Sequence, residues 1–305
     1  MAIVFSFNMR QPATAGSGNN ELQSRQVRLK GTNGAAVLLI HGLTGTPFEM
    51  GYLATYLNRK GYSTYCPRLA HHGEPIQMLK KALWQECYQS VKDALQEISA
   101  EHTHVFVSGL SMGALLALLL ALDYPEKVAG VSCLSPTIFY DGWNMPWYRC
   151  FLPFAYLRPL RYFLYFKEEP PYGIKNEAIR AQVDKYYRKA TLCDYTRVAD
   201  FGYPYFPVAL LYQLQRLVKY VSRRLPEVRS PVQIVQAQED DMTSVKNATF
   251  IHERIASEKK EIVLLDNSYH VITADQERNK VAEKMNEFFD TIINGTRQEV
   301  FSRAG

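Results

Sequence analysis

Two kinds of feature are scarce in this sequence: long apolar runs and paired cysteines. The longest apolar stretch, Met112–Leu122, has 11 residues, whereas a membrane-spanning helix needs about 20, so we expect no such helix. The five cysteines are odd in number and contain no Cys-x-x-Cys pair, which favours a reducing compartment over a disulfide framework. The first 20 residues lack a charged start followed by an apolar core, so we expect a cytoplasmic protein without a secretion signal.

Motifs for phosphate, metals and nucleic acids are also missing. The sequence has no glycine-rich loop of the Walker or Gly-x-Gly-x-x-Gly type. No His-x-x-x-His pair or Cys/His set has the spacing of a metal site, so we expect neither a metal nor a cofactor. The formal net charge of +5 over 305 residues is mildly basic, and by itself it does not indicate a nucleic-acid partner.

What the chain does have is an alternation of short apolar runs and helical patterns. Runs such as Ala36–Ile40, His104–Val107 and Val128–Leu134 predict buried strands. Apolar residues at helical spacing predict helices over Lys81–Ser99 and, at the end, over Gln276–Ile293. Strands that alternate with helices are typical of an α/β fold, in which helices flank a mostly parallel sheet.

The alternation stops between Thr137 and Arg229. This span holds 22 of the 38 aromatic residues and has 15 Lys/Arg against 8 Asp/Glu, a net charge of +7. It is too long to be a plain loop in a compact domain. We therefore expect a flexible lead-in at 1–20, a core at 21–136 and 230–295, a large helical cap inserted between two late strands at 137–229, and a tail at 296–305.

The strongest local signal is Gly109-Leu110-Ser111-Met112-Gly113. It matches Gly-x-Ser-x-Gly and lies between a predicted strand and a predicted helix, the context in which a nucleophilic serine projects from a tight turn. The N-terminus of the helix would also favour nearby negative charge. The alternative is a Gly-Ser turn without chemistry, which the strand and helix on either side disfavour.

A serine hydroxyl becomes a nucleophile when a base takes its proton, and the base needs an orienting carboxylate. His270 follows a predicted strand at Glu261–Leu265. Asp240 and Asp241 follow another at Val232–Val235. The chain order Ser, Asp, His is that of serine hydrolases with an α/β sheet. The residues alone leave the choice between the two aspartates open, and they also allow Asp240 to be a helix cap.

An acyl-transfer site also needs backbone N–H groups that bind an oxyanion. The turn His41-Gly42-Leu43-Thr44-Gly45 follows the first predicted core strand, so the N–H of Leu43 is a natural first donor. The N–H of Met112, directly after Ser111, is the second. The plainer alternative for His41-Gly42 is a turn that only ends a strand.

These segments resemble the serine α/β-hydrolases, in particular the branch of carboxylesterases and monoacylglycerol lipases. The matching stretches are LLIHGLTGTPFEM, YSTYCPRLAHHG, VFVSGLSMGALLAL, VQIVQAQEDDM and NSYHVITAD. The resemblance implies a catalytic triad and an oxyanion hole at these positions: Ser111, His270 and Asp240 (rather than Asp241), with the N–H groups of Leu43 and Met112. One departure is Ala114, where many relatives have a second glycine.

The resemblance implies hydrolysis of carboxylic esters through an acyl-enzyme, by a carboxylesterase or a monoacylglycerol or lysophospholipid lipase. A thioesterase or acyltransferase shares the same triad, and a non-catalytic ligand-binding homologue shares the same fold, so both stay open. The cap at 137–229 has no match, and its substrate-binding residues are not assigned.

The composition of the cap is the best clue to the substrate. Its aromatic residues predict a large apolar pocket for an ester or lipid, and its basic residues predict attraction to an anionic substrate or a peripheral contact with a membrane. The densest part, Trp143–Phe166, has ten aromatic residues, three arginines and no acidic residue. The alternative is that the aromatic residues fill the core of the cap and the arginines face water.

Overall fold

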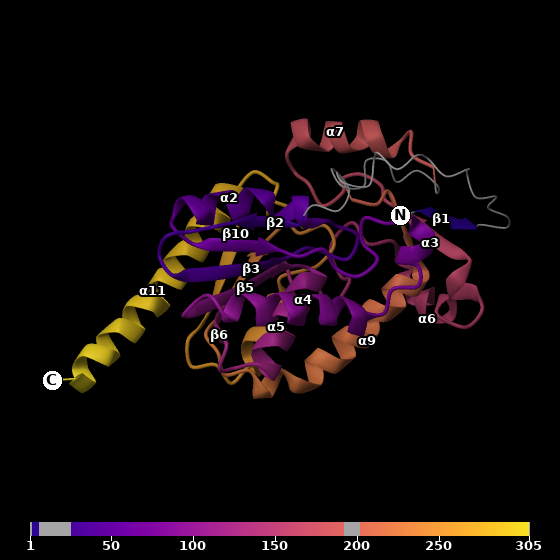
Figure 1. Cartoon of the computed structure of the whole chain (residues 1–305). Coiled ribbons are helices and arrows are strands. Elements are labelled where there is room, and N and C mark those ends of the chain that lie inside the picture. Colours follow the sequence, from indigo (N-terminus) through magenta and orange to yellow (C-terminus); the bar gives the residue numbers. More distant parts are fainter. Residues whose placement is uncertain (1, 6–25, 192–201, 305) are drawn as a thin grey trace.

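The computed structural model describes residues 2–5, 26–191 and 202–304, and its centre is a seven-stranded sheet (Figure 1). The strand order is β10-β9-β6-β5-β3-β4-β2. All neighbouring strands are parallel except β2 and β4. In chain order the strands are β2 (Val27–Leu29), β3 (Ala35–Ile40), β4 (Ser63–Cys66), β5 (His104–Leu110), β6 (Val128–Leu134), β9 (Val232–Ala237) and β10 (Lys260–Leu265).

Helices cover both faces of this sheet. In Figure 1, α2 and α11 lie on one side and α4, α5 and α9 on the other. Strand β3 shows why, because its buried residues alternate: Val37 and Leu39 pack in the cluster of α2 and α11, and Leu38 and Ile40 in the cluster of α4, α5 and α9. The helices of the core are η1 (Pro47–Met50), α2 (Gly51–Arg59), α3 (Ile76–Leu79), α4 (Trp84–Ser99), α5 (Met112–Asp123), α10 (Lys246–Arg254) and α11 (Arg278–Ala304). The predicted α/β fold with a mostly parallel sheet is confirmed.

The chain between β6 and β9 combines helices with a small sheet. Its elements are η2 (Trp147–Phe151), α6 (Leu152–Ala155), η3 (Leu160–Tyr162), β7 (Leu164–Lys167), α7 (Glu177–Tyr187), β8 (Tyr205–Pro207), α9 (Val208–Arg224) and η4 (Leu225–Glu227). Helix α9 packs on α4 and α5 and shares their apolar cluster. The last part of the span that we expected to be cap therefore packs on helices of the core.

The N-terminus differs from the expected flexible lead-in at 1–20. Residues Ala2–Phe5 form strand β1, which pairs antiparallel with β7, Ala2 opposite Lys167 and Phe5 opposite Leu164. These four residues are apolar and include two β-branched side chains, and they pair the backbone of β7 along an edge that would otherwise be open. The result is a three-stranded sheet, β1-β7-β8. The rest of the lead-in, residues 6–20, lies outside the described residues.

The ends of two predicted helices also differ. Helix α4 begins at Trp84 rather than Lys81, because the side chain of Glu86 accepts a hydrogen bond from the N–H of Leu83 at 2.9 Å and caps the first turn. Helix α11 continues to Ala304, past the expected end at Ile293 and through most of the expected tail. Among the helices described here, none is long and apolar enough to cross a membrane.

Candidate active site

Ser111 lies at a sharp turn between β5 and α5, with φ of 56° and ψ of −113°. The backbone of a non-glycine residue in this conformation is strained and needs support from its surroundings. The two glycines of the motif provide the space: a Cβ on Gly109 would lie 2.2 Å from the carbonyl carbon of Gly113, and one on Gly113 would lie 2.3 Å from the carbonyl oxygen of Ile40. The turn therefore requires glycine at both positions.

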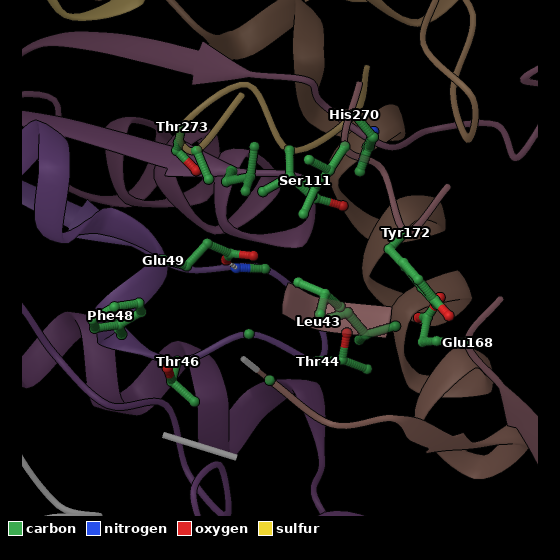
Figure 2. Close-up of a pocket in the computed structure, with 18 of the residues that line it drawn as sticks. Leu43, Thr44, Thr46, Phe48, Glu49, Ser111, Glu168, Tyr172, His270 and Thr273 are labelled. Carbon is green, nitrogen blue, oxygen red and sulfur yellow. Dashed lines mark hydrogen bonds between the residues drawn. The ribbon is translucent and has the colours of Figure 1, made fainter. Parts of the chain in front are cut away.

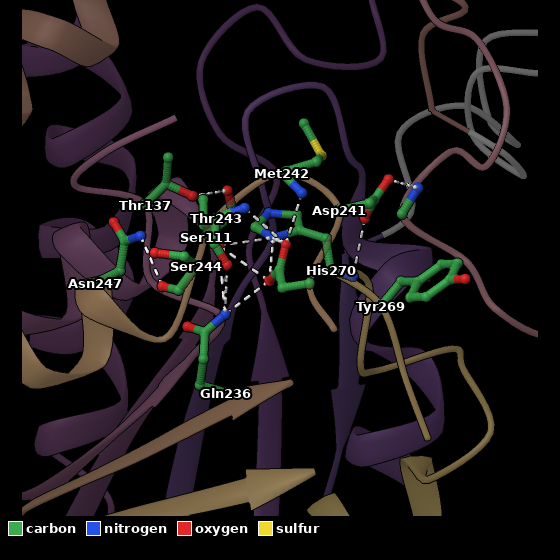
Figure 3. Close-up of polar contacts among 12 residues, drawn as sticks. Ser111, Thr137, Gln236, Asp241, Met242, Thr243, Ser244, Asn247, Tyr269 and His270 are labelled. Carbon is green, nitrogen blue, oxygen red and sulfur yellow. Dashed lines mark hydrogen bonds and ion pairs between the residues drawn. The ribbon is translucent and has the colours of Figure 1, made fainter. Parts of the chain in front are cut away.

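Asp240 contacts the ring of His270, which lies near Ser111 in the cluster of polar contacts in Figure 3. Nδ1 of His270 lies 2.9 Å from Oδ2 of Asp240 and 3.2 Å from Oδ1. Both side chains are almost fully buried. Asp240 also accepts hydrogen bonds from the N–H of Thr243 at 2.8 Å and from Nε2 of Gln236 at 2.7 Å. The carboxylate holds the proton of His270 on Nδ1, which leaves Nε2 as the basic nitrogen.

Asp241 has a different set of partners from Asp240. Its Oδ1 accepts the backbone N–H of His270 at 3.3 Å, and its Oδ2 accepts the N–H of Gly173 at 3.2 Å. Burial raises the pKa of Asp241 to about 6. Asp241 thus joins the backbone of the His270 loop to the segment between β7 and α7, whereas Asp240 contacts the imidazole ring.

Burial and charge act in opposite directions on His270. Burial lowers its pKa, but the carboxylates of Asp240, Asp241 and Glu49, with Asp240 foremost, together outweigh burial, and the net pKa lies above the ordinary value. The hydroxyls of Ser111 and Thr137 share a hydrogen bond of 2.8 Å. Within the described part of the chain no hydrogen bond joins Ser111 to His270, although both line one cavity. In free hydrolases the catalytic hydrogen bonds are often long and tighten only when substrate binds.

The N–H groups of Leu43 and Met112 are the expected oxyanion donors. Met112 is the first residue of α5 and Leu43 lies in the loop after β3. Neither N–H donates a hydrogen bond to another protein group among the described residues. The start of a helix leaves its first N–H groups without partners inside the helix and favours negative charge. Both groups can therefore serve an oxyanion.

The loop that carries Leu43 is fixed at three points around that N–H. Oε2 of Glu49 accepts the N–H of Gly42 at 2.8 Å, and Nδ1 of His41 lies 2.9 Å from the carbonyl oxygen of Gly42. Nε2 of His72 lies 2.8 Å from the carbonyl oxygen of Leu43. Burial lowers the pKa of both histidines, so each is a neutral ring that can donate one N–H. The sequence did not predict a role for Glu49, although this residue lies within the matching stretch LLIHGLTGTPFEM.

Ser111 and His270 line a cavity of about 510 Å³ (Figure 2). Both the core and the chain between β6 and β9 contribute residues to its lining. Those from the chain between β6 and β9 include Tyr140, Glu168, Tyr172, Ile179, Val183, Tyr187 and Phe206. Burial raises the pKa of Glu168 to about 7. Among the described lining residues, Arg278 is the single lysine or arginine, against the two carboxyl groups of Glu49 and Glu168. The interior of the cavity is therefore not basic.

Residues 31–277 match the family model of serine aminopeptidase, S33. The chain belongs to this family. It is 29% identical over 261 residues to a thermostable monoacylglycerol lipase of Bacillus sp. (strain H-257), with 83% of this chain and 89% of the relative covered. It is 27% identical over 263 residues to a carboxylesterase of Bacillus subtilis (strain 168), with 84% and 93% covered.

Solved structures of other proteins have the same fold as this S33 family member. One of two metagenome-derived lipolytic enzymes, LipS and LipT, has a TM-score of 0.73 and 24% identity, with 88% of this chain and 98% of that chain covered. A soluble variant of monoglyceride lipase from Saccharomyces cerevisiae has a TM-score of 0.71 and 18% identity, with 88% and 90% covered. The resemblance to the carboxylesterase and monoacylglycerol lipase branch of the serine α/β-hydrolases is confirmed.

Proposed function

We propose that this protein hydrolyses carboxylic esters with Ser111 as nucleophile, His270 as base and Asp240 as the carboxylate that orients it. The observation that carries the proposal is the buried contact of 2.9 Å between His270 and Asp240, next to a serine held in a strained turn at the same cavity. The names of the Bacillus relatives, a monoacylglycerol lipase and a carboxylesterase, support the ester as substrate.

The geometry supports a two-step reaction. Oγ of Ser111 attacks the ester carbonyl while Nε2 of His270 takes its proton, and the N–H groups of Leu43 and Met112 bind the oxyanion. The tetrahedral intermediate collapses, the alcohol leaves with the proton from His270, and the acyl group stays on Ser111. Water then attacks the acyl-enzyme with His270 again as base, which releases the acid and restores Ser111.

The cavity supports an ester that carries no negative charge. Its lining is largely apolar and aromatic, which suits an acyl chain. Arg278 is the single lysine or arginine among the described lining residues, so the cavity offers few cations to bind the phosphates of an acyl-CoA. We therefore favour a neutral monoacyl ester, such as a monoacylglycerol, over a thioester of coenzyme A.

We also propose that the protein touches anionic membranes through one surface of the cap. This aromatic surface consists of exposed large apolar residues of η2, α6 and η3 and their connections: Trp147, Phe151, Phe154, Leu157, Leu160 and Phe163. Arg149 and Arg158 are exposed beside them, and no acidic residue occurs from 142 to 167. Apolar side chains with flanking cations are what an anionic lipid interface binds.

The triad is tested by the change Ser111→Ala. We expect turnover of p-nitrophenyl butyrate and of a monoacylglycerol to fall at least about 1000-fold, because the nucleophile is lost, while thermal unfolding stays close to that of the wild type. Ser99→Ala, at the far end of α4, is the matched control and should keep full activity. Wild-type turnover by the Ser111 variant would exclude this mechanism.

A further inference from the structure

Glu49 is a carboxyl group in the active-site cavity that no step of the proposed reaction uses. It lies on η1, directly after the oxyanion loop, and its side chain folds back toward that loop (Figure 2). A Cβ on Gly45 would lie 2.4 Å from Oε2 of Glu49 and 2.8 Å from its carboxyl carbon. The loop from Gly42 to Gly45 therefore wraps closely around this carboxyl group, and glycine at 45 makes room for it.

The contact of Glu49 lies one residue from the first oxyanion donor. Its Oε2 accepts the N–H of Gly42 at 2.8 Å, and the peptide group that follows Gly42 carries the N–H of Leu43. The carbonyl oxygen of that same peptide group is held by the ring of His41. With the peptide groups on both sides of Gly42 fixed, the N–H of Leu43 has one direction in which to point.

The carboxyl group also lies close to the reacting centre. A Cβ on Gly42 would lie 3.4 Å from Oε2 of Glu49 and 3.7 Å from Cβ of Ser111. A negative charge at this place opposes the negative charge that develops on the oxyanion. The same charge favours the imidazolium of His270, whose pKa it raises. The charge of Glu49 therefore acts in both directions, and its role as a hydrogen-bond acceptor has to be separated from its charge by substitution.

We propose that Glu49 is a positioning residue, which holds the N–H of Leu43 in line for the oxyanion by accepting the hydrogen bond of Gly42. The inference rests on the proposed ester hydrolysis and adds a residue to it. Preorganised donors lower the barrier because they need no reorientation as the charge forms. Glu49 would therefore act on the transition state more than on the bound substrate.

Two substitutions of similar size separate the acceptor from the charge. Glu49→Met keeps the length of the side chain but removes its oxygen acceptors, and Glu49→Gln keeps an acceptor but removes the charge. Glu168→Gln removes the other cavity carboxyl group and leaves the loop untouched. For each variant we would measure kcat and KM with p-nitrophenyl butyrate, the affinity for a trifluoromethyl ketone that forms a hemiketal on the serine, and thermal unfolding.

We expect Glu49→Met to lower kcat by roughly 10- to 100-fold, the effect of losing one hydrogen bond to a charged group, with KM within about twofold because the ground state binds as before. Affinity for the ketone should fall by the same factor as kcat/KM. Glu49→Gln should recover most of the loss. Wild-type kcat in the Met variant, or an equal loss in the Gln variant, would refute the proposal. An inactive wild type would instead refute the ester hydrolysis itself.

Discussion

Asp240 and Asp241 are neighbours with the same side chain, yet the structure gives them different tasks. Asp240 contacts the ring of His270 and is held by backbone and side-chain donors, whereas Asp241 binds the backbone of His270 and of Gly173. The motif around them could not separate the two from residue type alone. The direction in which each side chain leaves the loop after β9 makes the difference.

The pH dependence of kcat/KM should report this difference. His270 acts as a base only when it is neutral, so activity rises with pH through its pKa, which lies above the ordinary value because nearby carboxylates, Asp240 foremost, together outweigh burial. In Asp240→Asn that carboxylate is lost, and the rise should shift to lower pH while kcat falls by about 10³–10⁴. The profile of kcat/KM from pH 5 to 9 measures both.

Asp241→Asn is the matched control for the Asp240 variant. Asp241 also favours the protonated form of His270, but less than Asp240 does, so its removal should shift the profile in the same direction by a smaller amount. Because the ring contact with Asp240 remains, kcat should fall far less. An unshifted profile in Asp240→Asn would contradict the role given to that carboxylate.

At the scale of elements, the start of α5 combines catalysis with packing. Gly113 approaches the backbone of β3 too closely for any side chain, whereas the next residue, Ala114, is fully buried and tolerated. The N–H of Ala114 donates to the carbonyl oxygen of Ser111 at 3.1 Å and closes the first turn. The side chain of Ala114 fills space in the apolar core beside the nucleophile.

Ala114→Gly should therefore destabilise the protein without disabling it. Loss of a buried methyl group and of helix propensity should lower the free energy of unfolding by about 1–2 kcal/mol, measured by urea denaturation. We expect kcat/KM to change less than twofold, because the turn at Ser111 keeps both of its glycines. Gly113→Ala is the contrast, since its Cβ would meet the carbonyl oxygen of Ile40 at 2.3 Å. Greater stability of the Ala114→Gly variant than of the wild type would contradict this account.

At the scale of the whole molecule, the described lysines and arginines of the cap lie outside the cavity lining, which contains several of its aromatic residues. Arg149 and Arg158 are exposed near the aromatic surface, while the cavity is lined by Glu49, Glu168 and several tyrosines. Arg161 is largely buried, with its guanidinium 4.2 Å from the ring centre of Tyr212. The net charge of the cap therefore indicates little about the substrate. It indicates more about which surfaces the outside of the cap can bind.

The proposed membrane contact is tested by flotation with vesicles. The wild type should float with vesicles that contain phosphatidylglycerol and stay behind with pure phosphatidylcholine, because arginines flank the apolar side chains. The double change Trp147→Ser and Phe154→Ser should abolish flotation, since these side chains are 79% and 65% exposed.

Leu264→Ser is the control for the vesicle experiment. Leu264 is also exposed but lies on β10, at an edge of the core sheet away from η2 and α6. This variant should float like the wild type, and all three proteins should hydrolyse a soluble short-chain ester at similar rates. Flotation of the double variant at the wild-type level would rule out the aromatic surface as the contact.

Much of the core could be predicted because its signals are short and local. Apolar runs such as Ala36–Ile40 form strands that are buried on both faces, and the turn at Ser111 depends on glycines two residues to either side. The small sheet was not predicted, because Ala2–Phe5 pairs with residues about 160 positions later. A four-residue apolar segment contains no local pattern that indicates which strand it pairs with.

The sequence by itself determined the fold class, the family and the residues to examine, because sterics and periodicity act within a few residues. Only the tertiary structure decided how those residues meet. It brought the carboxylate of Asp240 to His270, and His72 and Glu49 to the loop of Leu43. Hydrogen bonds between distant segments depend on side-chain directions to within fractions of an ångström, and these are set by the packing of the whole chain.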